Sequence, residues 1–300
     1  MTPRFLALAL GACIAGPASA AISSVDLSNY RLVATYDLPA VQASEASAVT
    51  WNWDSDSLFV LGDEGDYIVE VNKQGQQLSV MNLFGFDDTE GLTYIGGGQF
   101  VITEERLQDA YVFSYQAGGA IGRGTLASVS IGATVGNVGI EGISYDPLNG
   151  HFIAVKEKTP QALYDTTLDF TNGTAGVTSL VTPANPFSQL FGTADLSDVQ
   201  VLSTIASLRG TADQDNLLII SQESSRLLEV SRDGTVLSQF DFSAIAGDAE
   251  GITIDGKGFI YVVGETPSLY VLAPVPEPEA VALLLAGLGL VGVAARRRTH

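Results

Sequence analysis

Sulfur and imidazole side chains are almost absent from this sequence. The 300 residues include one cysteine, Cys13, and two histidines, His151 and His300. A single cysteine excludes an internal disulfide and a cysteine-rich metal site. Only His151 lies away from the ends, and no GxSxG motif occurs. The sequence therefore argues against thiol chemistry, a Ser-His-Asp triad and a His- or Cys-ligated zinc or copper site.

Long apolar runs are also scarce, and the two that occur lie at the ends of the chain. At the N-terminus, Arg4 precedes the apolar run 5–15 and a small-residue stretch that ends at Ala20. This order is typical of a secretory signal peptide, so we expect residues 1–20 to be removed by cleavage after Ala20. An alternative places a lipoprotein cleavage site before Cys13, although the apolar run ahead of it is short.

The second apolar run, residues 280–295, follows a Pro-Glu-Pro motif and precedes three arginines. The residues concerned are Pro276, Glu277, Pro278, Arg296, Arg297 and Arg298. The run is shorter than the ~20 residues of a usual membrane helix, but it suits a short transmembrane segment with its arginines on the cytoplasmic side. A plain C-terminal membrane anchor is one interpretation.

The order of motif, apolar span and basic end closely resembles the PEP-CTERM sorting signal. That resemblance implies that residues 274–300 are a sorting tail, recognised and removed near the motif by an exosortase-type membrane peptidase. We therefore expect a protein exported to the cell envelope, cell surface or extracellular space. The tail would hold it in the membrane before processing, and residues 21–273 would form the working domain.

Basic residues are few: the chain has 14 Lys and Arg against 34 Asp and Glu. Removing the four arginines and two glutamates of the end segments leaves 10 basic and 32 acidic residues, a net charge of −22. A surface of this charge repels phosphate backbones, which argues against nucleic acid as a partner. It favours cations and basic surfaces, although acidity also serves solubility alone.

Five copies of a short pattern are present between the two ends. Each copy has an alternating strand, a turn, a second strand and then a glutamate, and the copies begin near residues 47, 90, 141, 197 and 250. Strand alternation and hairpin turns dominate each copy. Intervals of this length predict an all-β fold, a β-propeller with four short strands in each blade.

The last copy ends after three strands, whereas an unpaired strand candidate, residues 30–38, precedes the first copy. Placing that N-terminal strand in the last blade completes five blades and closes the ring, which removes an exposed sheet edge. Six blades remain an alternative. The segment 202–216 interrupts the fourth copy between its first two strands, and we expect it to project from the face opposite the glutamates.

Carboxylates recur at the same points of the repeat. Second strands are followed by Glu64, Glu105, Glu157, Glu223 and Glu265, and first strands begin at Glu90, Glu141 and Glu250, with Asp198 nearby in the fourth copy. In an antiparallel hairpin the start of one strand lies beside the end of the next, so both sets are expected at one mouth of the central channel. A bound cation would relieve their repulsion, and all-oxygen ligands suit calcium, or magnesium with retained waters.

The same glutamates also suit a structural role, in which they accept backbone hydrogen bonds from the next blade or pair with nearby cations. The candidate cations are Arg106, Lys156, Lys158 and Arg226.

Several segments, taken in order, resemble the SdiA-regulated, YjiK-like family. They include Glu90-Gly91-Leu92-Thr93-Tyr94, residues 100–106, Glu141-Gly142-Ile143-Ser144-Tyr145-Asp146-Pro147, residues 155–158 and Asp195-Leu196-Ser197-Asp198. The resemblance covers nearly all of residues 30–272 and implies a propeller fold, an envelope setting and calcium binding. Gln222 departs from the pattern, where an acidic residue often stands, which puts the fourth blade's part in a metal site in doubt.

These features predict a cell-envelope or extracellular binding propeller with a calcium site at its acidic mouth, whose ligand would be a polysaccharide or another envelope molecule. Whether the protein is an enzyme stays open. The alternative is a metal-dependent hydrolase, phytase-like or lactonase-like, in which the cation polarises the substrate and a mouth glutamate activates water. A matrix protein that binds basic partners or polysaccharide through bridging cations is a further interpretation.

Overall fold

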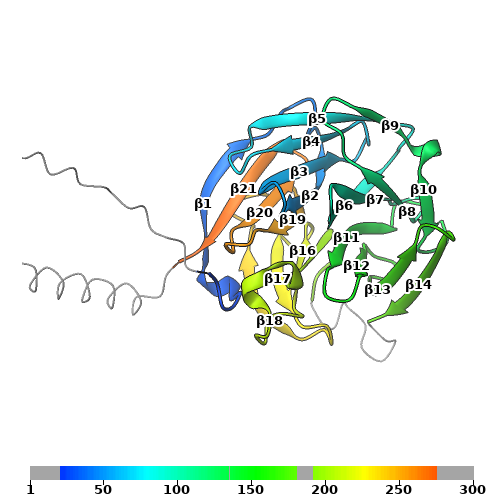
Figure 1. The fold of residues 1–300 in the computed structure, drawn as a ribbon. Coiled ribbons are helices and arrows are strands. Elements are labelled where there is room, and N and C mark those ends of the chain that lie inside the picture. Colours follow the sequence, from blue (N-terminus) through cyan, green and yellow to red (C-terminus); the bar gives the residue numbers. More distant parts are fainter. Residues whose placement is uncertain (1–20, 135, 181–191, 276–300) are drawn as a thin grey trace, which may run out of the picture.

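Five blades surround a central channel in the computed structural model, which describes residues 21–134, 136–180 and 192–275 (Figure 1). The innermost strands are β2 (Ala46–Asn52), β6 (Thr89–Gly96), β11 (Ile140–Asp146), β15 (Asp198–Val201) and β19 (Ala249–Ile254). Each contacts the innermost strand of the next blade, and β19 contacts β2, so the ring is closed. The predicted five-bladed propeller is confirmed.

Each blade continues outward as an antiparallel sheet. The second strands are β3 (Ser57–Gly62), β7 (Gln99–Glu104), β12 (His151–Lys156), β16 (Leu217–Ser221) and β20 (Ile260–Gly264). The third strands are β4 (Tyr67–Val71), β8 (Asp109–Ser114), β13 (Ala162–Asp169), β17 (Arg226–Val230) and β21 (Ser268–Pro274). The outer strands are β5 (Gln77–Phe84), β10 (Ala127–Ser130), β14 (Thr174–Ser179), β18 (Val236–Asp241) and β1 (Tyr30–Asp37).

The N-terminal strand closes the last blade, as the sequence predicted. β1 pairs antiparallel with β21, from Tyr30 opposite Pro274 to Asp37 opposite Ser268. The 3₁₀ turn η1 (Leu27–Asn29) precedes it and packs against β18 of the neighbouring blade. β1 thus supplies the outer strand of the last blade, and both ends of the described domain are held in one sheet.

One feature of the ring has no counterpart in the repeat. The short strand β9 (Ala120–Gly122) leaves the second blade and pairs in parallel with β5 of the first, giving that sheet a fifth strand. The 3₁₀ turn η2 (Arg123–Thr125) then leads back into β10. This crossing strand links the first two blades at the outer edge of the propeller.

Apolar side chains fill the spaces between blades. The described residues form five buried clusters, one for each pair of neighbouring blades. Phe59 and Leu61 of β3, for instance, pack with Tyr94 and Phe100 of the second blade. Since the described domain contains no disulfide, this packing stabilises the ring.

A layer of polar side chains lies across the middle of the channel. Backbone N–H groups of Tyr94, Tyr145, Val201 and Trp51 donate to hydroxyls of the preceding blade at 2.9–3.2 Å. The fifth link is a hydrogen bond from the Thr253 hydroxyl to the Gln200 amide oxygen, 2.9 Å. The side chains of this layer are Thr50, Thr93, Ser144, Gln200 and Thr253. They bind the five blades to one another around the axis.

Candidate functional site

A local irregularity directs the first-strand glutamates into the channel. In four blades the pairing of the innermost strand skips one residue, a β-bulge, and the skipped residues are Ser47, Glu90, Glu141 and Glu250. A bulged residue is left out of the strand ladder and its side chain is re-aimed. All four line one cavity at the channel mouth.

The glycine after each bulged glutamate allows close contact between neighbouring blades. A side-chain carbon on Gly91 would lie 3.2 Å from the Ile143 backbone nitrogen, and one on Gly251 would lie 2.9 Å from the Ala48 α-carbon. At Gly142 the distance to the Asp198 α-carbon would be 2.6 Å. Adjacent innermost strands therefore approach too closely for a side chain, and the repeated Glu-Gly pair joins a channel residue to a contact between blades.

The second-strand residues reach the same cavity from the position just after each strand. These residues are Asp63, Glu105, Glu157, Gln222 and Glu265. In the first and fourth blades this is one residue earlier than the predicted Glu64 and Glu223. Because neighbouring residues of an extended chain face opposite ways, the one-residue difference turns those two side chains out of the cavity.

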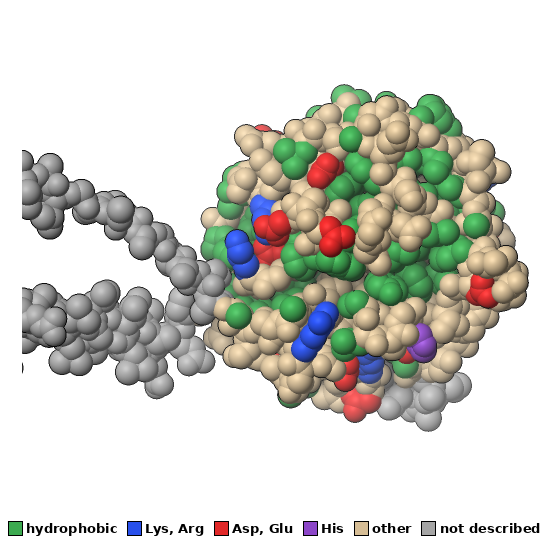
Figure 2. Space-filling model, in the orientation of Figure 1, with side chains coloured by type: hydrophobic (Ala, Val, Ile, Leu, Met, Phe, Trp, Pro, Cys, Tyr) green, Lys and Arg blue, Asp and Glu red, His purple; other side chains and the backbone are tan. Residues whose placement is uncertain are grey.

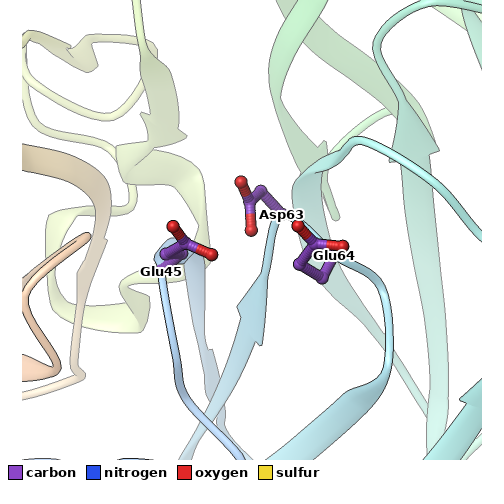
Figure 3. Close-up of side chains that lie close together, drawn as sticks. All are labelled: Glu45, Asp63 and Glu64. Carbon is purple, nitrogen blue, oxygen red and sulfur yellow. The ribbon is translucent and has the colours of Figure 1, made fainter.

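Glu64 and Glu223 instead lie at the rim. Glu223 pairs with Lys158 at 2.9 Å. Glu64 joins Glu45 and Asp63 in a second group whose oxygens lie within 4.8 Å of one another (Figure 3). Asp198 is buried beside the channel, where it accepts hydrogen bonds from the backbone N–H groups of Val199 and Ile252 at 2.7 and 2.8 Å. It acts as a link between blades.

The cavity at the mouth has a volume of about 390 Å³ and is strongly acidic. Its carboxylates are Glu45, Asp63, Asp88, Glu90, Glu105, Glu141, Glu157, Asp195, Glu250 and Glu265. Among the described residues that line it, Arg106 is the one cation, and Ser47, Asn137, Ser197 and Gln222 complete the wall. Six of the eight predicted glutamates therefore meet in this cavity, while Glu45, Asp63, Asp88 and Asp195 were not predicted.

Some of these carboxylates have structural partners. Glu157 pairs with Lys158 at 2.5 Å, and Asp88 with Arg106 at 3.0 Å. Glu105 accepts the Gly139 backbone N–H at 2.7 Å. Glu90, Glu141, Glu250 and Glu265 have no ion pair within the described ranges. The structural role considered for these residues thus applies to part of the set.

Burial and mutual repulsion disfavour ionisation of the cavity carboxylates. Burial and, after it, the charge of Glu265 raise the pKa of Glu250 to about 8. Burial likewise raises the pKa of both Asp63 and Asp88 to about 6. The pKa values of Glu90 and Glu141 are also raised, first by burial and then by neighbouring glutamates. Protons or cations must therefore compensate these groups at neutral pH.

Two features of the cavity suit a hard cation. Glu105, Glu141 and Glu157 each offer an oxygen, and the three oxygens lie within 4.8 Å of one another. Within the described part of the chain, Asp63 Oδ1 and Asp88 Oδ2 are buried without a hydrogen-bond partner. Unpaired buried oxygens are costly, and a cation is one way to satisfy them.

Comparison with known proteins places this chain in a family. Residues 23–273 match the family model described as SdiA-regulated. The chain belongs to the SdiA-regulated family. Residues 274–298 match the PEP-CTERM protein-sorting motif, which implies processing by exosortase-type machinery and supports export to the cell envelope or surface. This member of the SdiA-regulated family is therefore an exported propeller protein.

Solved structures share the fold of this SdiA-regulated protein. Myxococcus xanthus glutaminyl cyclase is 15% identical, with a TM-score of 0.56 over 81% of this chain and 95% of that one. The WD40 β-propeller domain of Doa1 is 10% identical, with a TM-score of 0.48 over 82% and 97%. Virginiamycin B lyase from Staphylococcus aureus is 13% identical, with a TM-score of 0.42 over 80% and 69%. The first of these supports the propeller fold alone.

Both predicted end segments lie outside the described residues. They comprise the signal peptide with its cleavage at Ala20, the segment 280–295, and the tail residues Pro276, Glu277, Pro278, Arg296, Arg297 and Arg298. None of the helices in residues 21–134, 136–180 and 192–275 has the length and hydropathy needed to span a membrane.

Proposed function

We propose that this protein is an exported binding propeller whose acidic mouth holds calcium. The observation that carries the proposal is the charge imbalance of the cavity. Ten carboxylates and one arginine line about 390 Å³ at the end of the channel. A divalent cation would let the carboxylates with raised pKa values ionise, and it would offer its open face to a ligand in the solvent.

The donor set favours calcium over the transition metals. The described residues that line the cavity include carboxylates, hydroxyls and amides but no histidine or cysteine. Calcium takes about 6–8 oxygen ligands in a flexible arrangement, which a crowded ring of carboxylates can supply. Magnesium demands a stricter octahedron and retains waters. Glu105, Glu141 and Glu157 would form the centre of the site.

The cation would also determine the ligand class. A calcium ion on the mouth can bridge the protein to the hydroxyl or carboxylate oxygens of an acidic polysaccharide or another envelope molecule. Exosortase-type processing of the tail and short-lived membrane attachment through residues 280–295 would deliver the domain to that setting.

Glu141→Gln tests which residues bind calcium. For the unsubstituted domain, calcium at about 100 times its dissociation constant is expected to add ~2.7 kcal/mol of stability, a rise of roughly 5–10 °C in melting temperature. Glu141→Gln should weaken calcium binding at least about tenfold, because it removes one charged ligand. Thermal unfolding across a calcium series measures both.

Glu223→Gln is the matched control, because Glu223 carries the same side chain but lies outside the cavity against Lys158. It should respond to calcium as the unsubstituted domain does. Equal calcium responses from Glu141→Gln and Glu223→Gln would exclude Glu141 as a ligand.

A metal-dependent hydrolase is the second candidate, and one observation favours it. The fourth blade contributes the neutral Ser197, where three other blades place a glutamate, and the neutral Gln222, where all four others place a carboxylate. A cation bound near Glu105 and Glu157 would keep an open side toward that blade, where a substrate oxygen and a water molecule can enter. Gln222 already donates to Glu250 at 2.8 Å, which orients its amide into the cavity.

This alternative predicts calcium-dependent hydrolysis of a phosphate ester or a lactone. Glu105→Gln and Glu157→Gln should each lower the rate by about a hundredfold or more, because loss of a ligand or of the base removes several kcal/mol of transition-state stabilisation. Steady-state assays on p-nitrophenyl phosphate and a simple aryl lactone measure this. Hydrolysis that survives both substitutions would contradict the mechanism.

A further inference from the structure

The far end of the channel holds a second pocket with different chemistry. Its volume is about 250 Å³, and its walls include Trp51, Trp53, Thr204, Ala206 and Arg209. Trp51 belongs to β2 and Trp53 follows it, whereas the other three belong to the segment between β15 and β16. The 3₁₀ turns η3 (Leu202–Thr204) and η4 (Ala206–Leu208) form there. The insertion that interrupts the repeat thus builds one wall of this pocket.

The pocket is separated from the acidic mouth by the polar layer across the channel. That layer encloses a space of about 10 Å³, room for no more than one water. The face seen in Figure 2 lies away from the mouth: acidic side chains are scattered on it, and hydrophobic side chains gather toward its middle. A ligand bound here does not share the cation of the mouth.

Two half-buried indole rings dominate the pocket. The Trp51 and Trp53 rings lie 6.5 Å apart between centroids at 68°, an edge-to-face arrangement, and both residues line the pocket. Trp51 donates its ring N–H to Asp56 at 3.1 Å. The ring N–H of Trp53 makes no hydrogen bond with any described residue, so it can still donate to a ligand. Gly256 gives Trp51 room, because a side-chain carbon there would lie 2.9 Å from the ring.

Arg209 supplies a positive charge to the pocket. It is exposed, and in the described ranges its guanidinium makes no ion pair or hydrogen bond. Asp56, the acceptor of the Trp51 ring N–H, pairs with Lys73 at 2.6 Å, and Lys73 also pairs with Asp255 at 2.8 Å. A free guanidinium beside an aromatic wall is well suited to a planar anion such as a carboxylate, which it binds through two parallel hydrogen bonds.

We propose that this pocket binds one uronic acid unit of an acidic polysaccharide. The apolar C–H face of the pyranose ring would lie on an indole ring, where an amphipathic aromatic side chain contributes contact area and a polar N–H. The sugar carboxylate would bind Arg209, and its hydroxyls would reach the Thr204 hydroxyl and the Trp53 N–H. The volume fits a single sugar ring and is smaller than that of most drug-sized ligand sites. This proposal does not depend on calcium at the mouth.

The chain itself offers a local reporter for the test. It has two tryptophans, and both lie in this pocket, so intrinsic tryptophan fluorescence reports on the site. Titration with the trimer of galacturonic acid should give a saturable change in that fluorescence. The neutral trimer of galactose should bind about tenfold more weakly, because it lacks the carboxylate that Arg209 binds. Addition of a calcium chelator should leave the binding unchanged.

Arg209→Gln should weaken galacturonate binding about tenfold, while its control, Arg31→Gln, should leave it unchanged. Arg31 is an exposed arginine on β1 that donates to backbone carbonyls of its own segment. Absence of any fluorescence change, equal binding of the acidic and neutral trimers, or undiminished binding by Arg209→Gln would each overturn the proposal. Loss of binding on chelation would place the sugar at the mouth instead.

Discussion

Replacing Gly142 with alanine is expected to lower the free energy of unfolding by about 3 kcal/mol, because over-packing between rigid backbones is not relieved by side-chain movement. The new carbon would lie 2.6 Å from the Asp198 α-carbon and 3.0 Å from the Val199 nitrogen. Either the two innermost strands separate or the hydrogen bonds of Asp198 to Val199 and Ile252 are strained. Urea-induced unfolding followed by circular dichroism measures the change.

Gly247→Ala is the control for this substitution. A side-chain carbon on Gly247 meets no atom within 4 Å, although this residue lies two positions ahead of the innermost strand β19. Its free energy of unfolding should stay within about 0.5 kcal/mol of the unsubstituted domain. If Gly142→Ala leaves the free energy of unfolding equally unchanged, β11 and β15 are not too close for a side chain there. Blade contact would then not explain the glycine of the repeated Glu-Gly pair.

The second large effect is a loss of stability with rising pH when divalent cations are removed. Burial holds the pKa of Asp63 and Asp88 at about 6 and that of Glu250 at about 8, against unfolded values near 4. Between these limits the folded state holds more protons than the unfolded state, so stability falls as pH rises. The stabilisation from these protonated carboxyls is fully present below pH ~4 and is lost as the pH rises from about 4 to 8.

The expected size is about 4 kcal/mol between pH 5 and 8.5, or roughly 8–16 °C in melting temperature. Most of it comes from Glu250, because solvent screens the contribution of the partly exposed Asp63 and Asp88. Calcium should abolish most of this loss, since it binds the ionised carboxylates and displaces their protons. Thermal scans at several pH values, with chelator and with calcium, measure both effects. Stability that rises over this range in chelator would contradict the electrostatics of the cavity.

Most of the fold could be predicted from the sequence, because the repeat has a strong period and ends on a broken copy. The predicted strand 30–38 corresponds to β1, Tyr30–Asp37, in the position that closes the ring. The crossing strand β9 was not predicted. Its three residues, Ala120–Gly122, pair with a strand of another blade, and a segment so short carries no periodic signal of its own.

The candidate site was predicted less completely, and the reason is register. Glu64 and Glu223 were chosen because each is a glutamate just beyond a second strand, yet Asp63 and Gln222 occupy the aligned positions. Counting from the paired residues Gly62 and Ser221 would have found them, since a shift of one residue reverses the face. Asp88 and Asp195 each precede a cavity residue, Glu90 and Ser197, by two positions. The sequence analysis considered only the Glu-Gly pair and did not use this spacing.

The repeated motif therefore carries two kinds of information. Its glycine is needed for blade contact in any propeller with strands this close, so its presence supports the fold and says nothing of a ligand. The glutamate before it is different. Burying Glu90, Glu141 and Glu250 in one cavity raises their pKa values and costs stability, which a purely structural role does not explain.

The central claim is that the acidic mouth binds a divalent cation, and calorimetric titration of chelator-treated residues 21–273 with calcium at pH 7.5 tests it most directly. We predict saturable binding, a binding heat that differs between buffers of unequal ionisation enthalpy because protons are released, and a matching rise in melting temperature. The account would be contradicted if calcium gave no binding heat in either of two such buffers and no shift in melting temperature.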